Sequence, residues 1–300
     1  MTTESKTKSP IADDLSQMRV ALSMPCRRCG YELKELGADG DCPECGEPIR
    51  LTIIEVVDPT SRRLQPIHKP KSVGNSIASV VLFYFVAIII AVLALVSRAP
   101  ESLPIPSALR SISTISFVWT SALTSIIAFT CLLPMMRMCK RQELAGCRKG
   151  LVMTFSGLWL WAISMGINAW LLLNIKMQST EVAMLFDICL PVVSAGLVFS
   201  GFRHLVPRLG QRSRAFRQAQ GSRQRMNDLL AALIVIIVGR TFLAVSDTDS
   251  NLALLGLIIM VMSLSLIVIG LGYLLRNVIW IRNALITPPP ALIDLLHLRG

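Results

Sequence analysis

The sequence predicts an all-α polytopic membrane bundle with a small metal-held β module in front of it. The first observation behind this prediction is composition: 53% of the 300 residues are hydrophobic and 16% are charged, against about a quarter charged in typical soluble domains. The charges are clustered, so long uncharged runs remain, and such runs of about 18 or more residues indicate transmembrane helices. The second observation is a set of four paired cysteines near the start of the chain.

The paired cysteines have the spacing of a metal site. Cys26 and Cys29 form one Cys-x-x-Cys pair, Cys42 and Cys45 form a second, and a glycine follows each pair. Four thiolates in a tetrahedron suit Zn²⁺, with iron as the main competitor. The glycines allow a backbone conformation that other residues resist. We therefore predict one structural zinc ion bound by these four residues, and we expect disulfides less in a reducing compartment.

The motif Cys-x-x-Cys-Gly-Tyr-x-Leu, which begins at Cys26, is followed by Cys-Pro-Glu-Cys-Gly from Cys42. Together they resemble the four-cysteine zinc ribbons at the N-terminus of multi-span membrane proteins of bacteria, over about residues 25–50 only. The resemblance implies a small metal-stapled β fold and little about activity, because zinc ribbons serve as structural or docking units in many proteins. Residues 51–57 are apolar and rich in β-branched side chains, so we expect them to finish the ribbon's sheet.

Composition also sets the boundaries around this module. Residues 1–24 are polar or mixed and are expected to form a flexible N-terminal tail, which leaves residues 25–57 for the zinc ribbon. Residues 58–76 hold three prolines among basic residues and predict a semi-extended tether. Residues 276–300 follow the last apolar run and are expected to form a cytoplasmic C-terminal tail.

Six apolar runs are long enough to cross about 30 Å of hydrocarbon at roughly 1.5 Å per residue. They predict a transmembrane domain over residues 77–275, with spans at 77–96, 112–133, 151–175, 182–202, 229–246 and 252–275. Small residues four apart, Ala162 with Gly166 and Gly196 with Ser200, are expected to form helix-packing contacts.

Basic residues predict the orientation of these spans. The N-terminal region, the loops after spans two and four and the C-terminal tail together hold 26 Lys and Arg, and the loops on the other side hold three. Because cytoplasmic loops carry the excess of Lys and Arg, we predict six crossings of the inner (cytoplasmic) membrane with both termini in the cytoplasm. The richest loop leaves two interpretations open: it anchors the topology only, or it contacts anionic lipid. The arginines that would make this lipid contact are Arg208, Arg212, Arg214, Arg217, Arg223 and Arg225.

Two ionisable side chains lie deep in the spans, Asp187 in the fourth and Arg240 in the fifth. Both are expected roughly 8–9 Å below the outer surface at about 1.5 Å per residue. A lone charge in hydrocarbon is costly, so we predict an Asp187–Arg240 ion pair, which Asn168 of the third span could join at a similar depth. The alternatives are that each side chain snorkels separately to the surface or that the pair is a substrate or proton site.

The sequence favours a binding role over catalysis. It contains no metalloprotease, nucleophile-elbow, P-loop or dinucleotide motif, so we do not expect an enzyme. Nucleic acid is not an expected partner, because residues 26–50 hold four basic and six acidic side chains and phosphate binding needs a positive surface. We expect the ribbon to dock a cytoplasmic protein partner in a scaffold or sensor role. The alternatives are a small-solute or ion transporter with a polar site between helices, and an intramembrane enzyme with no recognisable motif.

Overall fold

The chain divides into two compact units. The first comprises Met1–Leu64 with Thr287–Gly300, and the second comprises Gln65–Ile286. The computed structural model describes residues 17–58, 64, 67, 69–97, 106–107, 111–139, 145–174, 188–219, 225–245, 251–290 and 292–298.

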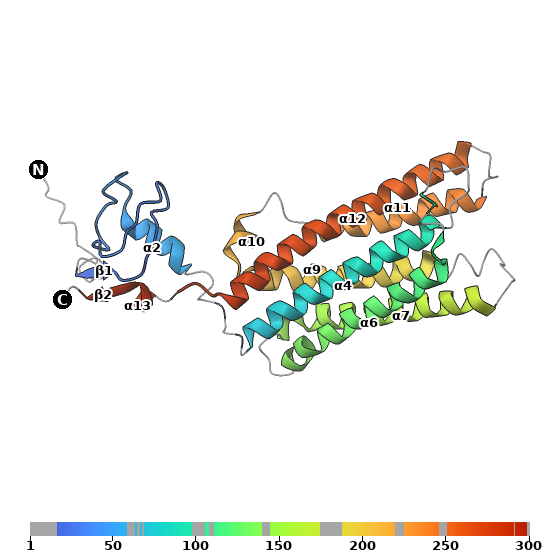
Figure 1. Ribbon diagram of the computed structural model, residues 1–300, viewed down its shortest axis with the longest axis horizontal. Helices are drawn as coiled ribbons and strands as arrows, with labels where there is room; N and C mark the ends of the chain where they lie inside the picture. The colour runs from blue at the N-terminus through green and yellow to red at the C-terminus, as the bar shows by residue number, and fades with distance from the viewer. Residues whose placement is uncertain are drawn as a thin grey trace, which may run out of the picture. The chain divides into compact units, whose positions relative to one another are not determined.

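The second unit is a helical bundle (Figure 1). Among the described residues, six helices are long and apolar enough to cross a membrane, as the sequence predicts. They are α4 (Pro70–Ser97), α6 (Thr114–Cys139), α7 (Arg148–Asn174), α9 (Leu190–Gly210), α11 (Met226–Val245) and α12 (Asn251–Ile286). The last of them continues well past residue 275, where the sequence prediction ends it. The short helices η1 (Ala145–Cys147) and α10 (Arg214–Gln218) lie before α7 and after α9.

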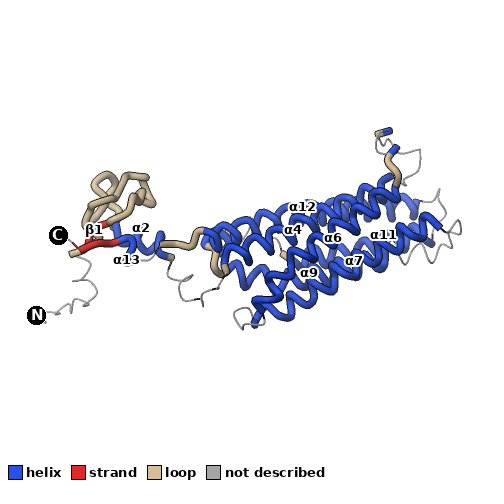
Figure 2. The backbone as a smooth tube through the Cα atoms, turned by 60° about the horizontal axis from the view of Figure 1, so that its bottom comes forward, coloured by secondary structure: helices blue, strands red, loops and turns tan. Residues whose placement is uncertain are grey.

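The six helices form a closed ring. Each packs against the next along the chain, and α12 returns to pack against α4, where the Arg282 Nε donates to the Asn75 Oδ1 over 2.8 Å. Figure 2 shows the helices running along one common direction. Because consecutive helices run in opposite senses, the starts of α4, α7 and α11 share one end of the bundle with the ends of α6, α9 and α12.

Glycines let some of these helices approach closely. A Cβ added at Gly256 would lie 2.7 Å from the carbonyl oxygen of Gly239, and one added at Gly157 would lie 2.8 Å from a carbonyl oxygen of α9. Any larger side chain at these positions would push α11 from α12, or α7 from α9. The contacts predicted from four-residue spacing are wrong for Gly166 and Gly196, because a Cβ added at either one would meet no described atom within 4 Å.

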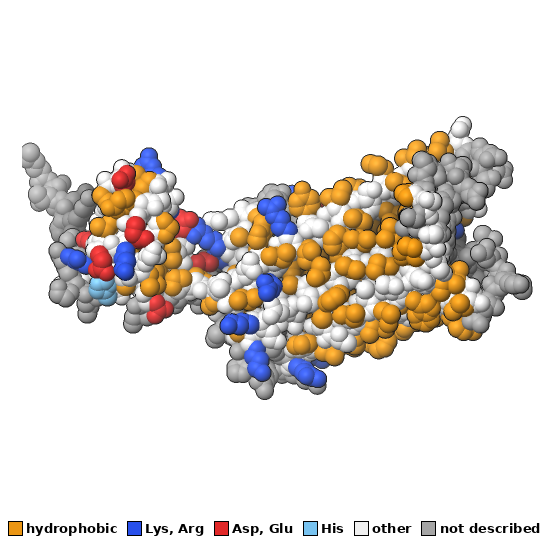
Figure 3. Space-filling model, viewed as in Figure 1, with side chains coloured by type: hydrophobic (Ala, Val, Ile, Leu, Met, Phe, Trp, Pro, Cys, Tyr) orange, Lys and Arg blue, Asp and Glu red, His pale blue; other side chains and the backbone are white. Residues whose placement is uncertain are grey.

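The surface of the bundle fits a membrane protein. Figure 3 shows apolar side chains along its visible sides and Lys and Arg side chains gathered at one end. Large apolar side chains are exposed on α11 and α12, including Ile234 (64%), Met262 (60%) and Leu266 (58%), which monomeric soluble proteins rarely show as a continuous surface. We call the end shared by the starts of α4, α7 and α11 the basic end. It carries Lys71, Arg148, Lys149, Arg208, Arg225, Arg276 and Arg282.

The first unit joins the two ends of the chain. Strand β1 (Met18–Val20) pairs antiparallel with β2 (Leu296–Leu298), with Val20 opposite Leu296, and these distant segments lie side by side in Figure 1. The short helix α13 (Leu292–Leu295) precedes β2. Both predicted tails, 1–24 and 276–300, therefore contain a strand.

The prediction of a strand at residues 51–57 is wrong, because the structure has helix α2 (Ile49–Val57) there. Its buried side chains are Ile49, Thr52, Ile53 and Val57, a spacing of three and four residues that belongs to one helix face. That face packs into the core of the first unit. The β-branched composition favours a strand, but the spacing of the buried side chains is that of a helix.

Candidate metal centre

Two matching turns present the four thiols. In the first, the N–H of Gly30 donates to the carbonyl of Cys26 over 2.9 Å, and in the second, the N–H of Gly46 donates to the carbonyl of Cys42 over 2.9 Å. The two glycines have φ of +79° and +66°, a region that costs side-chain-bearing residues roughly 1–2 kcal/mol. The sequence expectation of an unusual glycine conformation after each pair is confirmed.

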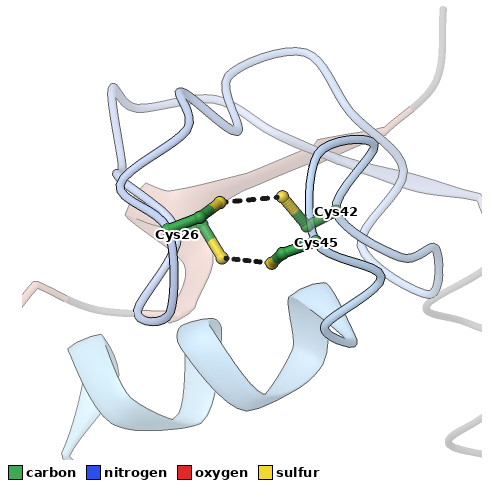
Figure 4. Close-up of side chains that lie close together, drawn as sticks. Cys26, Cys42 and Cys45 are labelled. Atoms are coloured by element: carbon green, nitrogen blue, oxygen red, sulfur yellow. Dashed lines mark hydrogen bonds between the residues drawn. The ribbon is translucent and has the colours of Figure 1, made fainter.

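The sulfur atoms are spaced for a metal ion. All four Sγ atoms lie within 4.8 Å of one another. The Cys26 and Cys45 sulfurs are 3.7 Å apart and the Cys29 and Cys42 sulfurs 3.6 Å apart, as the dashed lines in Figure 4 mark. A zinc ion about 2.3 Å from each sulfur of a regular tetrahedron separates the sulfurs by about 3.8 Å. A disulfide needs about 2.05 Å, so the thiols are free and the donor set fits zinc.

Hydrogen bonds and crowding give the four thiols different acidities. The backbone N–H of Cys29, with that of Arg28, lowers the pKa of the Cys26 thiol to about 6. At Cys45 the N–H of Glu47 favours the thiolate, but desolvation and the neighbouring thiols outweigh it and raise the pKa to about 12. Four sulfurs this close cannot all ionise unless a cation offsets their charge. A divalent metal bound here would therefore release the remaining protons.

Polar side chains around the sulfurs hold the two turns together. Arg27 pairs with Glu47 across the two turns, and its backbone N–H donates to the Thr52 Oγ1 of α2 over 3.4 Å. Glu32 accepts from the Ser23 hydroxyl and from backbone N–H groups, and these bonds, the Ser23 bond foremost, lower its pKa. Glu32 and Glu47 are two of the six acidic residues that make nucleic acid an unexpected partner. Their hydrogen-bond and ion-pair partners do not follow from the spacing of residues in the sequence.

Two residues of the predicted intramembrane set, Arg240 and Asn168, lie among the described residues. Asp187 lies outside the described residues, so its pairing with Arg240 stays a prediction. The Arg240 Nε is buried and has no hydrogen-bond partner among the described residues. Asn168 is buried in α7 and lines a cavity of about 110 Å³ within the bundle. The sequence does not predict this cavity, because its lining comes from all six helices.

The arginines expected to contact lipid are placed around the basic end, except Arg223, which lies outside the described residues. Helix α10 carries Arg214 and Arg217. Its N-cap is Ser213, whose hydroxyl accepts from the N–H of Phe216 over 3.3 Å, and the Phe216 side chain is buried in the bundle core. A second hollow at this end is lined by Arg148, Lys149, His204 and Arg208, among others. The fold therefore concentrates positive charge on this surface.

Comparisons with known proteins assign no family to this chain. No protein-family model, no curated protein and no solved structure matches it. Two features of the described residues bear on function: six helices of membrane-spanning length, and a cluster of four cysteines able to hold a metal ion.

Proposed function

We propose that this chain is an integral membrane protein whose cytoplasmic first unit is a structural zinc module that docks a protein partner, in a scaffold or sensor role. The four sulfurs within 4.8 Å of one another carry the proposal. Zinc is favoured over iron because the resembled family uses it, and because four thiolates suit its tetrahedral preference.

A structural role follows from the completeness of the ligand set. Four protein thiolates fill the coordination sphere of zinc, whereas catalytic zinc sites keep one position open for water or substrate. The module also exposes large apolar side chains, Leu22 (45%), Tyr31 (40%) and Ile54 (54%). Apolar side chains on a metal-stapled surface are the kind of feature that a protein partner buries, and this supports docking over catalysis.

Metal analysis of the purified full chain tests the zinc site. We expect about one zinc per chain, in line with a closed four-thiolate site, and loss of the metal from Cys29→Ser and Cys45→Ser. Cys131→Ser is the matched control, because Cys131 is a free cysteine of α6 outside the cluster. Full zinc content in both ligand variants, or iron in place of zinc, would contradict the proposal.

We further propose that the basic end of the bundle faces the cytoplasm of an inner membrane and contacts anionic lipid. Lys and Arg are retained on the cytoplasmic side and each is attracted to anionic headgroups by about 1 kcal/mol. Reporter fusions at Lys71 and Gly300 should read as cytoplasmic and a fusion at Asp249 as external. A fusion that reads on the wrong face contradicts this topology.

A transporter is the second candidate function, because the cavity between the helices is lined from all six of them. Its lining is apolar apart from Asn168, whereas transporters of polar solutes place several polar groups or broken helices at the site. In-cell crosslinking of the intact chain and the Cys29→Ser variant separates the two roles. A scaffold loses a specific partner when the metal module is disrupted, and a transporter does not.

A further inference from the structure

We propose that the cavity inside the six-helix bundle binds a short section of one hydrocarbon chain of an anionic phospholipid whose phosphate lies against Arg240. The inference rests on the proposed membrane location. It extends that proposal by assigning an anionic phospholipid to a cavity in the second unit, separate from the metal module.

The cavity is suited to a hydrocarbon chain. Its volume is about 110 Å³, and its lining includes Ala91 of α4, Trp161 of α7, Ala195 of α9 and Leu264 of α12. A cavity of roughly 150 Å³ lined by apolar residues binds a molecule the size of benzene, so a space of this size holds a short section of a hydrocarbon chain and not a whole one. Asn168 is the single side chain with an amide or charge in the lining, so water and ions have few partners there.

The position of the cavity determines which apolar ligand is available. Its α4 and α7 lining comes from the second half of each helix. Its lining around the start of α9 comes from Ile188, which precedes the helix, and from Pro191, Val192 and Ala195 in its first turns. The cavity therefore lies in the half of the bundle away from the basic end, at the depth of the hydrocarbon when the bundle spans a bilayer. Lipid chains are the apolar groups that surround the protein at that depth.

We place the route by which the chain enters the cavity between α9 and α11. Helices α9 and α11 pack against each other less extensively than any other neighbouring pair of the ring. Both line the cavity, through Val192 and Ala195 on α9 and Leu233 and Ile236 on α11. A chain that enters between α9 and α11 reaches the cavity without leaving the hydrocarbon.

Arg240 supplies the polar end of the site. Leu233, Ile236 and Arg240 are three and four residues apart, so they share one face of α11, and Arg240 lies one turn beyond the cavity lining toward the end of the helix at Val245. Its buried Nε has no hydrogen-bond partner among the described residues, and a buried donor without a partner is destabilising. A guanidinium binds phosphate oxygens in a bidentate manner, and its five N–H groups leave donors for phosphate even beside a carboxylate such as Asp187.

The test reconstitutes the full chain in nanodiscs that hold equal amounts of phosphatidylglycerol and phosphatidylcholine with the same chains. Native mass spectrometry then counts the lipids retained after the discs are removed. We expect one retained phosphatidylglycerol on the unmodified chain. We expect none on Ala91→Phe, which fills the cavity, and one on the matched control Ala231→Phe, because Ala231 is exposed on α11. Equal retention by Ala91→Phe, checked for native helix content, overturns the proposal, and Ala195→Leu repeats the test with a smaller side chain.

The headgroup is tested at Arg240. Arg240→Gln should lower the preference for phosphatidylglycerol by roughly fivefold, as expected for one cation near an anionic headgroup, while Arg240→Lys should keep most of it. Inorganic phosphate at millimolar concentration should not displace the lipid, and displacement would identify a free-anion site and overturn the proposal. Membrane fractionation separates the failures: a chain absent from membranes refutes the proposed location, and an inserted chain without bound lipid refutes the cavity assignment alone.

Discussion

The C-terminal segment should control how tightly the metal module holds its ion. The side chain of Leu295 is 2% exposed and belongs to the buried core that the described residues of the first unit form. Its carbonyl accepts from the N–H of Ala21 over 2.7 Å. Leu295→Ala keeps this backbone bond and removes the buried side chain, so the change isolates the contribution of packing.

The magnitude follows from burial. Replacing a fully buried leucine by alanine costs about 2.7–5 kcal/mol in well-packed cores. In a small module whose folding is coupled to metal binding, this loss lowers the apparent metal affinity. At about 1.4 kcal/mol per tenfold, Leu295→Ala should weaken zinc binding by roughly 100-fold or more.

Competition with a chromophoric chelator on the detergent-solubilised full chain measures the apparent zinc affinity. The matched control is Leu292→Ala, the same substitution in the same segment at a side chain that is 46% exposed. It should change the free energy by no more than about 0.5 kcal/mol. If Leu295→Ala binds zinc as tightly as the control, the C-terminal strand is not part of the metal-coupled fold and the reasoning is refuted.

Three further predictions concern the turns, the helix packing and the intramembrane pair. Gly46→Ala should destabilise the metal module by roughly 1–2 kcal/mol, because φ is +66° there and a Cβ strains that conformation. The measurement is the midpoint of unfolding by a metal chelator, and a midpoint equal to that of the unmodified chain would contradict this prediction. Gly239→Leu should separate α11 from α12 and lower the thermal stability of the bundle, whereas Gly272→Leu should not, because a Cβ there would meet no described atom within 4 Å. Asp187→Asn and Arg240→Gln should each destabilise the bundle and the double variant should recover part of the loss, while additive losses would exclude the pair.

The features that the sequence predicts well are those that one stretch of chain determines by itself. Each of the six helices is a long apolar run, and hydrocarbon leaves such a run only the helix as a way to satisfy its backbone groups. The metal cluster was predictable for a similar reason, because each Cys-x-x-Cys-Gly turn is complete within five residues. The outcome at Gly46, with its positive φ, follows from that local requirement.

The features that the sequence does not predict depend on distant segments. Strands β1 and β2 have three residues each, too few for an alternation pattern, and their pairing joins the two ends of the chain. The cavity is likewise a property of the ring, because no single helix shows that the six apolar faces leave space between them. At α2 the prediction of a strand relied on composition, because Ile53 and its neighbours are β-branched. The buried residues of this segment are spaced three and four apart, which is the spacing of a helix.

Tyr84 gives a final test of the packing inside the ring. It is fully buried, with the rings of Trp161, Phe199 and Phe202 edge-on at centroid distances of 5.6, 6.2 and 6.5 Å. Its hydroxyl has no hydrogen-bond partner among the described residues, and a buried hydroxyl without a partner costs about 1–3 kcal/mol. Tyr84→Phe keeps every ring contact and removes that cost, so it should raise the thermal stability of the bundle.

The matched control for Tyr84→Phe is Tyr273→Phe, at a side chain on α12 that is 46% exposed, where the loss of the hydroxyl should change stability by less than about 0.5 kcal/mol. Both variants are compared by thermal unfolding in the same detergent. Because the ring contacts are unchanged, a loss of stability in Tyr84→Phe alone can come only from a hydrogen bond that the hydroxyl makes in the folded bundle. That result would refute the assignment of Tyr84 as a packing residue, and it would place a polar partner in the middle of the ring.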